Sequence, residues 1–141
     1  MLKFRAKTWL NVKGIRMAVR QGQVGPLERC ALLVESEAKK SMSTGGGSDK
    51  TSSPPGEPPH VQTGVLRGSI TTAMEKFWRF IVGPTRIAWY GSVHEFGGRH
   101  HPPRPFMWPA LMNTHKRFKR FFKDMPLART KAGLRLNTRT K

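Results

Sequence analysis

A stretch without any bulky apolar residue, STGGGSDKTSSPPGEPPH at residues 43–60, divides this chain into two parts. Glycine and serine in its first half favour a flexible backbone, and the prolines in its second half favour a stiffer one. Because such residues cannot build a hydrophobic core, we expect 43–60 to be a flexible loop on which folding does not depend. The core must therefore come from the segments on either side.

The segment before this loop has a helical pattern. Its apolar residues recur at intervals of three and four, as on one face of a helix: Leu27, Ala31, Val34, Ala38 and Met42. Proline suits the first turn of a helix, so we predict a helix from Pro26 to about residue 42. A separate helical pattern starts at Trp9 and is interrupted at Gly22 and Gly25, and residues 2–8 alternate apolar and basic residues like a short edge strand.

After the loop, the pattern is mixed. Thr63 and Gly64 open a helical turn, residues 69–74 and 78–82 form a predicted hairpin, and residues 86–90 suggest a third strand. In the second strand of the hairpin, Trp78, Phe80 and Val82 are expected on one face and Arg79 and Ile81 on the other. A helical turn over Val93–Phe96 follows, and a last helix runs from Pro109 to about Asp124. In this helix the apolar stripe is Ala110 or Leu111, Thr114, Phe118, and Phe121 or Phe122.

These elements predict an α+β fold, in which an N-terminal and a C-terminal helix pack on a small antiparallel β-sheet. A chain of 141 residues is expected to hold one such domain, which we place at residues 1–124. Residues 125–141 have no periodicity and are predicted to be a basic, extended tail.

The net charge of +18 is concentrated at the two ends. Six Lys and Arg residues lie in residues 1–20, and ten lie in residues 116–141 against a single acid, Asp124. Such ends indicate a polyanionic neighbour, which is either nucleic acid or an acidic protein surface. A membrane partner is disfavoured because no apolar run is long enough to span a bilayer. The one cysteine, Cys30, excludes an internal disulfide and is predicted to be a small core residue.

Catalytic and metal-binding motifs are not found. Four histidines lie close in sequence, His94, His100, His101 and His115, but position 98, where a metalloprotease helix needs its second histidine, is glycine. The Gly-x-Ser-x-Gly motif of hydrolases is missing as well. We therefore expect no enzyme activity, no cofactor and no small-molecule substrate. Glu95 is the one notable carboxylate; capping of backbone N–H groups or pairing with Arg99 or Arg104 is favoured over acid–base catalysis.

The basic face of the last helix and the tail could contact DNA phosphates without reading bases. No zinc finger, RNP or KH motif is present, so sequence-specific reading is not expected. The candidate residues for this contact are Lys116, Arg117, Lys119, Arg120, Lys123, Arg129, Lys131 and Arg135.

Three blocks, in order, resemble a known family: HVQTGVLRGSI at 60–70, YGSVHEFGG at 90–98 and PPRPFMWPAL at 102–111. The family is that of the neck or tail-completion (head–tail joining) proteins of long-tailed bacteriophages and related prophages. The resemblance covers residues 27–122. The chain departs from the family pattern at Gly91, where alanine is common, and in its long Gly/Ser/Pro loop and basic tail.

The resemblance implies a non-catalytic α+β protein of the virion, assembled in the host cytoplasm. Such proteins form homo-oligomeric rings at the head–tail junction, next to connector or stopper proteins on one side and tail terminator or tail tube proteins on the other. They adjoin the channel through which packaged DNA passes. The alternative class is a stand-alone, basic nucleic-acid-binding accessory protein.

The Pro-rich segment before the last helix suits an assembly surface. Prolines reduce the entropy lost when a segment is fixed against a partner, and aromatic side chains are common interface anchors. Phe106 and Trp108 are the expected anchors, although Phe106 could equally be a core residue. The other candidate interface residues are Pro105, Pro109 and Glu95, together with Leu134 and Leu136 of the tail, which would enter a groove of a neighbouring protein.

Overall fold

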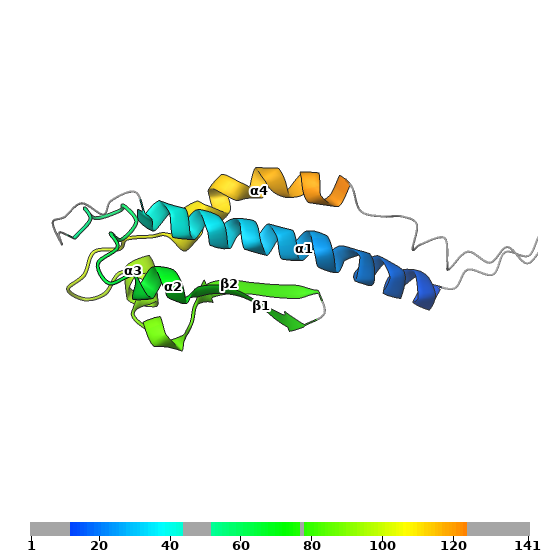
Figure 1. Ribbon diagram of the computed structural model, residues 1–141, viewed down its shortest axis with the longest axis horizontal. Helices are drawn as coiled ribbons and strands as arrows, with labels where there is room; N and C mark the ends of the chain where they lie inside the picture. The colour runs from blue at the N-terminus through cyan, green and yellow to red at the C-terminus, as the bar shows by residue number, and fades with distance from the viewer. Residues whose placement is uncertain (1–11, 44–51, 77, 124–141) are drawn as a thin grey trace, which may run out of the picture.

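The computed structural model describes residues 12–43, 52–76 and 78–123. One long helix, α1 (Val12–Ser43), extends along most of the described part of the chain and at about 1.5 Å per residue is roughly 48 Å long (Figure 1). Our prediction that Gly22 and Gly25-Pro26 break this helix is wrong, because α1 passes through Pro26 without interruption. Burial of the α1 residues that follow Pro26, together with the contact of Arg20 with the Trp78 ring before it, offsets the hydrogen bond that a proline cannot donate.

The small elements follow in the order α2 (Val65–Ser69), β1 (Ile70–Lys76), β2 (Arg79–Pro84), η1 (Arg86–Ala88) and α3 (Gly91–Phe96). The predicted third strand over residues 86–90 is wrong. The chain instead turns into the short 3-10 helix η1, where the N–H of Ala88 donates to the carbonyl of Thr85 at 2.9 Å. The predicted strand at residues 2–8 lies outside the described residues.

The described sheet has two antiparallel strands, with Ile70 opposite Pro84 and Thr72 opposite Val82. Along β2, Arg79 and Ile81 are exposed while Phe80 and Val82 are half-buried, which is the predicted alternation. The fold class is therefore confirmed: helices combine with a small antiparallel sheet in an α+β arrangement.

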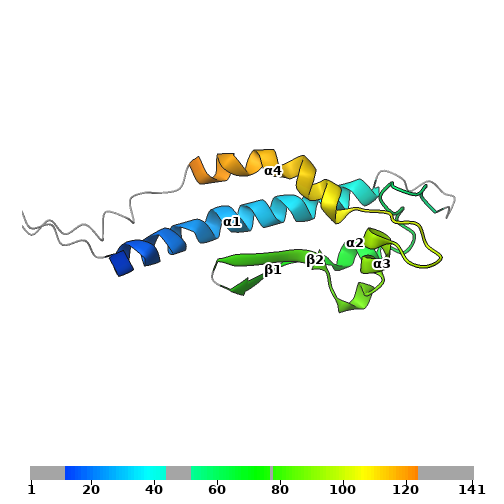
Figure 2. The same cartoon turned by 180° about the vertical axis from the view of Figure 1, so that it is seen from behind.

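The last helix, α4 (Met107–Lys123), lies on one side of α1, and the β-hairpin lies on the other (Figures 1 and 2). One hydrophobic cluster joins the three layers: Val34, Ala38 and Met42 of α1, Ile70 of β1, and Phe106 and Ala110 at the start of α4. Cys30 is also buried on α1, as predicted.

The second half of the Gly/Ser/Pro stretch is not a separate loop. Residues 44–51 lie outside the described residues, but Ser53 and Pro59 are buried. The N–H of Gly56 donates to the carbonyl of Pro103 at 2.9 Å, and Nε of Arg104 donates to the carbonyl of Ser53 at 2.8 Å. Backbone hydrogen bonds thus attach the described part of this stretch to the segment before α4, although it has no bulky side chain. The expectation that folding does not depend on residues 43–60 stays a prediction.

Candidate assembly surface

Glu95 holds the first turn of α4 in place. Its Oε2 accepts hydrogen bonds from the backbone N–H groups of Phe106 at 2.8 Å and Met107 at 2.9 Å, and its Oε1 accepts one from Trp108 at 2.9 Å. The first N–H groups of a helix have no partner within the helix, and a negative charge is favourable at this end. Of the roles considered for Glu95, the structure shows the cap, in which both carboxylate oxygens accept hydrogen bonds from the same chain.

This cap explains why α4 begins at Met107 and not, as predicted, at Pro109. The glutamate satisfies the N–H groups that precede the proline, so the helix starts two residues earlier. Pro109 then occupies the first turn, where its missing N–H group costs no hydrogen bond.

The three sequence blocks meet around this helix start. Block 60–70 supplies α2 and the buried Ile70, block 90–98 supplies α3 with Glu95, and block 102–111 supplies Phe106. Phe106 packs in one cluster with Ile70 and is only 1% exposed. The core alternative for Phe106 is the one that the structure shows, so Phe106 is not an exposed anchor.

Gly91 allows α3 to lie close to the hairpin. A Cβ atom at this position would lie 2.8 Å from Cγ of Pro84 and 3.1 Å from Cδ1 of Leu66. Both distances are shorter than ordinary carbon contacts, so a larger residue would push α3 away from its neighbours. Glycine at position 91, where the family that the chain resembles commonly has alanine, therefore fits the close packing of α3 against Pro84 and Leu66.

Trp108 is the exposed aromatic residue of the Pro-rich segment. Its side chain is 62% exposed, whereas Pro105 and Pro109 beside it are half-buried. Met112, one helical turn after Trp108, is also partly exposed, and the two residues form a small apolar patch at the start of α4. The next positions on this face are the polar residues His115 and Lys119.

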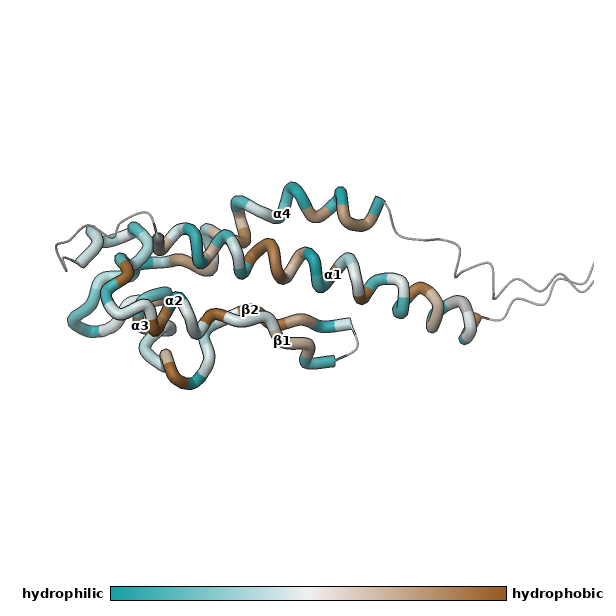
Figure 3. Tube along the Cα trace, viewed as in Figure 1, coloured by the Kyte–Doolittle hydropathy of each residue, from teal (hydrophilic) through white to brown (hydrophobic). Residues whose placement is uncertain are grey.

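A second group of exposed apolar residues was missed by the sequence analysis. Ile87, Trp89 and Phe96 are 76%, 74% and 82% exposed. The turn that contains η1 projects from the hairpin and combines hydrophobic with hydrophilic residues (Figure 3). A strand over residues 86–90 would have buried part of this group. The spacing of Trp89, Val93 and Phe96, four and then three, was the available signal, but it is too short to identify a helix.

The basic face of α4 is as predicted in its described part. Lys116, Arg117, Lys119, Arg120 and Lys123 are all exposed, and none forms a salt bridge with a described residue. The candidate contacts Arg129, Lys131 and Arg135, and the leucines Leu134 and Leu136, lie outside the described residues.

No group of three or more metal-ligating side chains occurs in the described ranges. His94 lies within reach of Arg104 and His101, and its pKa is lowered by burial and by these two neighbours. Within the described chain, no helix is long and apolar enough to cross a membrane.

Comparison of the sequence and the structure with protein-family models, curated proteins and solved structures gives no match.

Proposed function

We propose that this chain is a structural subunit of a bacteriophage neck, which forms a homo-oligomeric ring between the DNA-filled head and the tail. The observation that supports this proposal most is the joining of the three family-like blocks in space. Glu95 of the second block caps the helix of the third, and Phe106 of the third packs with Ile70 of the first. Residues of all three blocks therefore contact one another in the fold. Such contacts are expected if the three blocks belong to a single folded unit.

This unit presents large apolar side chains that its own core does not use. Trp108 lies next to the capped helix start, and Ile87, Trp89 and Phe96 project from η1 and α3. Exposed aromatic residues on rigid elements are typical anchors of protein interfaces. In the neck, these residues would contact neighbouring subunits and the connector, stopper, tail terminator or tail tube proteins.

A second candidate function is sequence-independent binding of nucleic acid by an accessory protein. It is favoured by the exposed basic face of α4. In the neck proposal the same face lies near packaged DNA, so DNA binding alone does not separate the two functions.

A joining assay does separate them. Heads and tails of the phage or prophage that encodes the chain are prepared without it, and the purified protein is added. We expect joined particles with the wild-type chain, fewer with Trp108→Ala, and the wild-type yield with Met74→Ala, which removes an exposed apolar side chain from β1. Unchanged joining without the protein would leave the accessory nucleic-acid function as the better account.

A further inference from the structure

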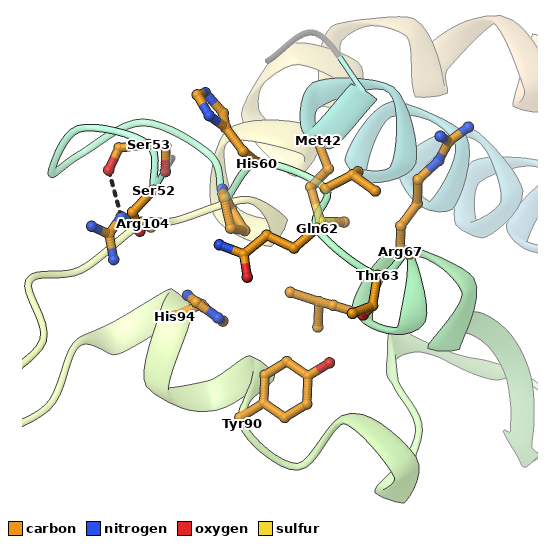
Figure 4. A pocket seen from close by; sticks show the side chains of 14 residues that line it. Met42, Ser52, Ser53, His60, Gln62, Thr63, Arg67, Tyr90, His94 and Arg104 are labelled. Atoms are coloured by element: carbon orange, nitrogen blue, oxygen red, sulfur yellow. Dashed lines mark hydrogen bonds between the residues drawn. The ribbon is translucent and has the colours of Figure 1, made fainter. Parts of the chain in front are cut away.

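A cavity of about 300 Å³ lies between the segment 52–67 and α3 (Figure 4). Its lining includes Arg67, Arg104, His60 and His94 but no aspartate or glutamate. Apolar atoms contribute as well, from Met42, Pro59, Val61 and Leu66. The cavity therefore combines positive charge with apolar surface, and none of the exposed residues assigned to assembly lines it.

Arg104 is a half-buried cation without a counter-ion. Its Nε donates to the carbonyl of Ser53 at 2.8 Å, and its backbone N–H donates to the carbonyl of His94 at 2.6 Å. Both acceptors are neutral, and no carboxylate of the described residues pairs with the guanidinium group. A partly desolvated charge is stabilised when an opposite charge reaches it.

The positive charge of Arg104 also affects the groups beside it. The pKa of His94 is lowered by burial first and then by the charges of Arg104 and His101. Tyr90 also lines the cavity and stands edge-on to His94, with ring centroids 5.9 Å apart, while its hydroxyl lies on the side of the cavity away from Arg104 (Figure 4).

The hydroxyl of Ser53 is a second polar group at this cavity that has no partner among the described residues. The residue is 2% exposed. Buried hydroxyl groups in proteins are usually paired, so an unpaired one at a cavity wall is consistent with a binding site.

We propose that this cavity binds the carboxylate side chain of an acidic peptide segment. The guanidinium group of Arg104 supplies the charge, the unpaired hydroxyl of Ser53, the residue that Arg104 contacts, supplies a further donor, and the apolar wall takes the methylene groups of the peptide side chain. A DNA strand fits less well, because a phosphate backbone needs a continuous basic track and has no apolar atoms to place against this wall. The inference does not depend on the neck function, since it rests on the lining alone.

The test is an NMR titration of the ¹⁵N-labelled full chain with the peptide acetyl-Gly-Leu-Glu-Leu-Gly-amide and with its glutamine counterpart. We expect saturable shifts in the amide signals of residues 52–67 and 90–94, and about tenfold tighter binding of the glutamate peptide. Arg104→Gln should abolish this preference, and Arg99→Gln, which replaces an exposed arginine outside the cavity, should preserve it.

Because Arg104 also holds the segment at Ser53, a second variant keeps the test decisive. Arg104→Lys keeps a positive charge at this position and should keep the preference for the glutamate peptide. Arg67→Gln removes an exposed cation whose guanidinium group is directed away from Arg104 (Figure 4), and it should change the affinity by less than about twofold. Parallel titrations use inorganic phosphate and a single-stranded oligothymidine. Equal binding of the two peptides, a preference kept in Arg104→Gln, or tighter binding of oligothymidine at this cavity would each overturn the proposal.

Discussion

The carboxylate Oε2 of Glu95 lies 2.8 Å from the backbone nitrogen of Phe106, and this hydrogen bond connects α3 to the start of α4. The connecting segment 97–105 is also held by the N–H of Arg104, which donates to the carbonyl of His94 at 2.6 Å. The prolines at 102, 103 and 105 therefore lie in a segment that is fixed at its end. The result is a rigid start for α4, with Phe106 directed into the core and Trp108 exposed.

Replacing Glu95 should destabilise the fold through the loss of this cap. We expect Glu95→Ala to lower the free energy of unfolding by about 2 kcal/mol, since three N–H groups lose a charged acceptor. Glu95→Gln, which keeps one oxygen acceptor, should lose less. Urea unfolding measures both, and Glu57→Ala, at an exposed position, should change stability by less than about 0.5 kcal/mol. Equal stabilities of the Glu95 and Glu57 variants would argue against the cap.

Gly91 should not tolerate a side chain. Gly91→Ala is expected to cost about 1–3 kcal/mol of unfolding free energy, because its Cβ would meet Pro84 and Leu66. Gly68→Ala is the matched control, since a Cβ there would have no neighbour within 4 Å. Thermal unfolding of the two variants should therefore move in different directions, with Gly68→Ala at or above the wild-type midpoint.

The two aromatic residues of the Pro-rich segment should behave differently. Phe106→Ala is expected to lower the free energy of unfolding by about 3–5 kcal/mol, because it leaves a cavity in the core cluster. Trp108→Ala should cost less than about 1 kcal/mol, because most of its side chain is exposed. Urea unfolding measures the loss of stability in both variants. A large loss in Trp108→Ala would contradict the assignment of Trp108 to an interface.

Acid should weaken the fold through His94. The pKa of His94 is lowered in the folded chain, by burial first and then by Arg104 and His101, whereas the unfolded chain titrates at the ordinary value near 6.5. The unfolded state therefore binds more protons as the pH falls through 6.5 and below, and the free energy of unfolding decreases over that range. His94→Gln should reduce this decrease, and His100→Gln, at an exposed position, should not. Identical pH profiles for wild type and His94→Gln would refute this role.

The sequence predicted the elements that have a clear periodicity. The apolar stripe from Leu27 to Met42, the alternation along β2 and the turn over Val93–Phe96 are all present. The helix break at Pro26 was wrongly predicted, because tertiary packing outweighed the local signal of the proline. The strand at 86–90 was wrongly predicted, because the chain turns after Pro84. Local propensities cannot show where a long helix finds contacts on both sides of a proline.

The candidate site was predicted in part. Glu95 was recognised as a possible cap, but its partners eleven to thirteen residues away could not be named from spacing. The cavity around Arg104 depends on residues 52–67 folding back onto α3, and no pattern in a segment of small residues and prolines indicates such a contact.

The most direct test of the neck proposal is the location of the chain in the particle. A reconstruction of purified virions, with mass spectrometry of their proteins, is expected to show copies of the subunit in a ring between the portal and the tail tube. The helices α1 and α4 should be recognisable in that density by their lengths of 32 and 17 residues. Absence of the chain from intact particles, or its presence only in infected-cell extracts, would contradict the proposal.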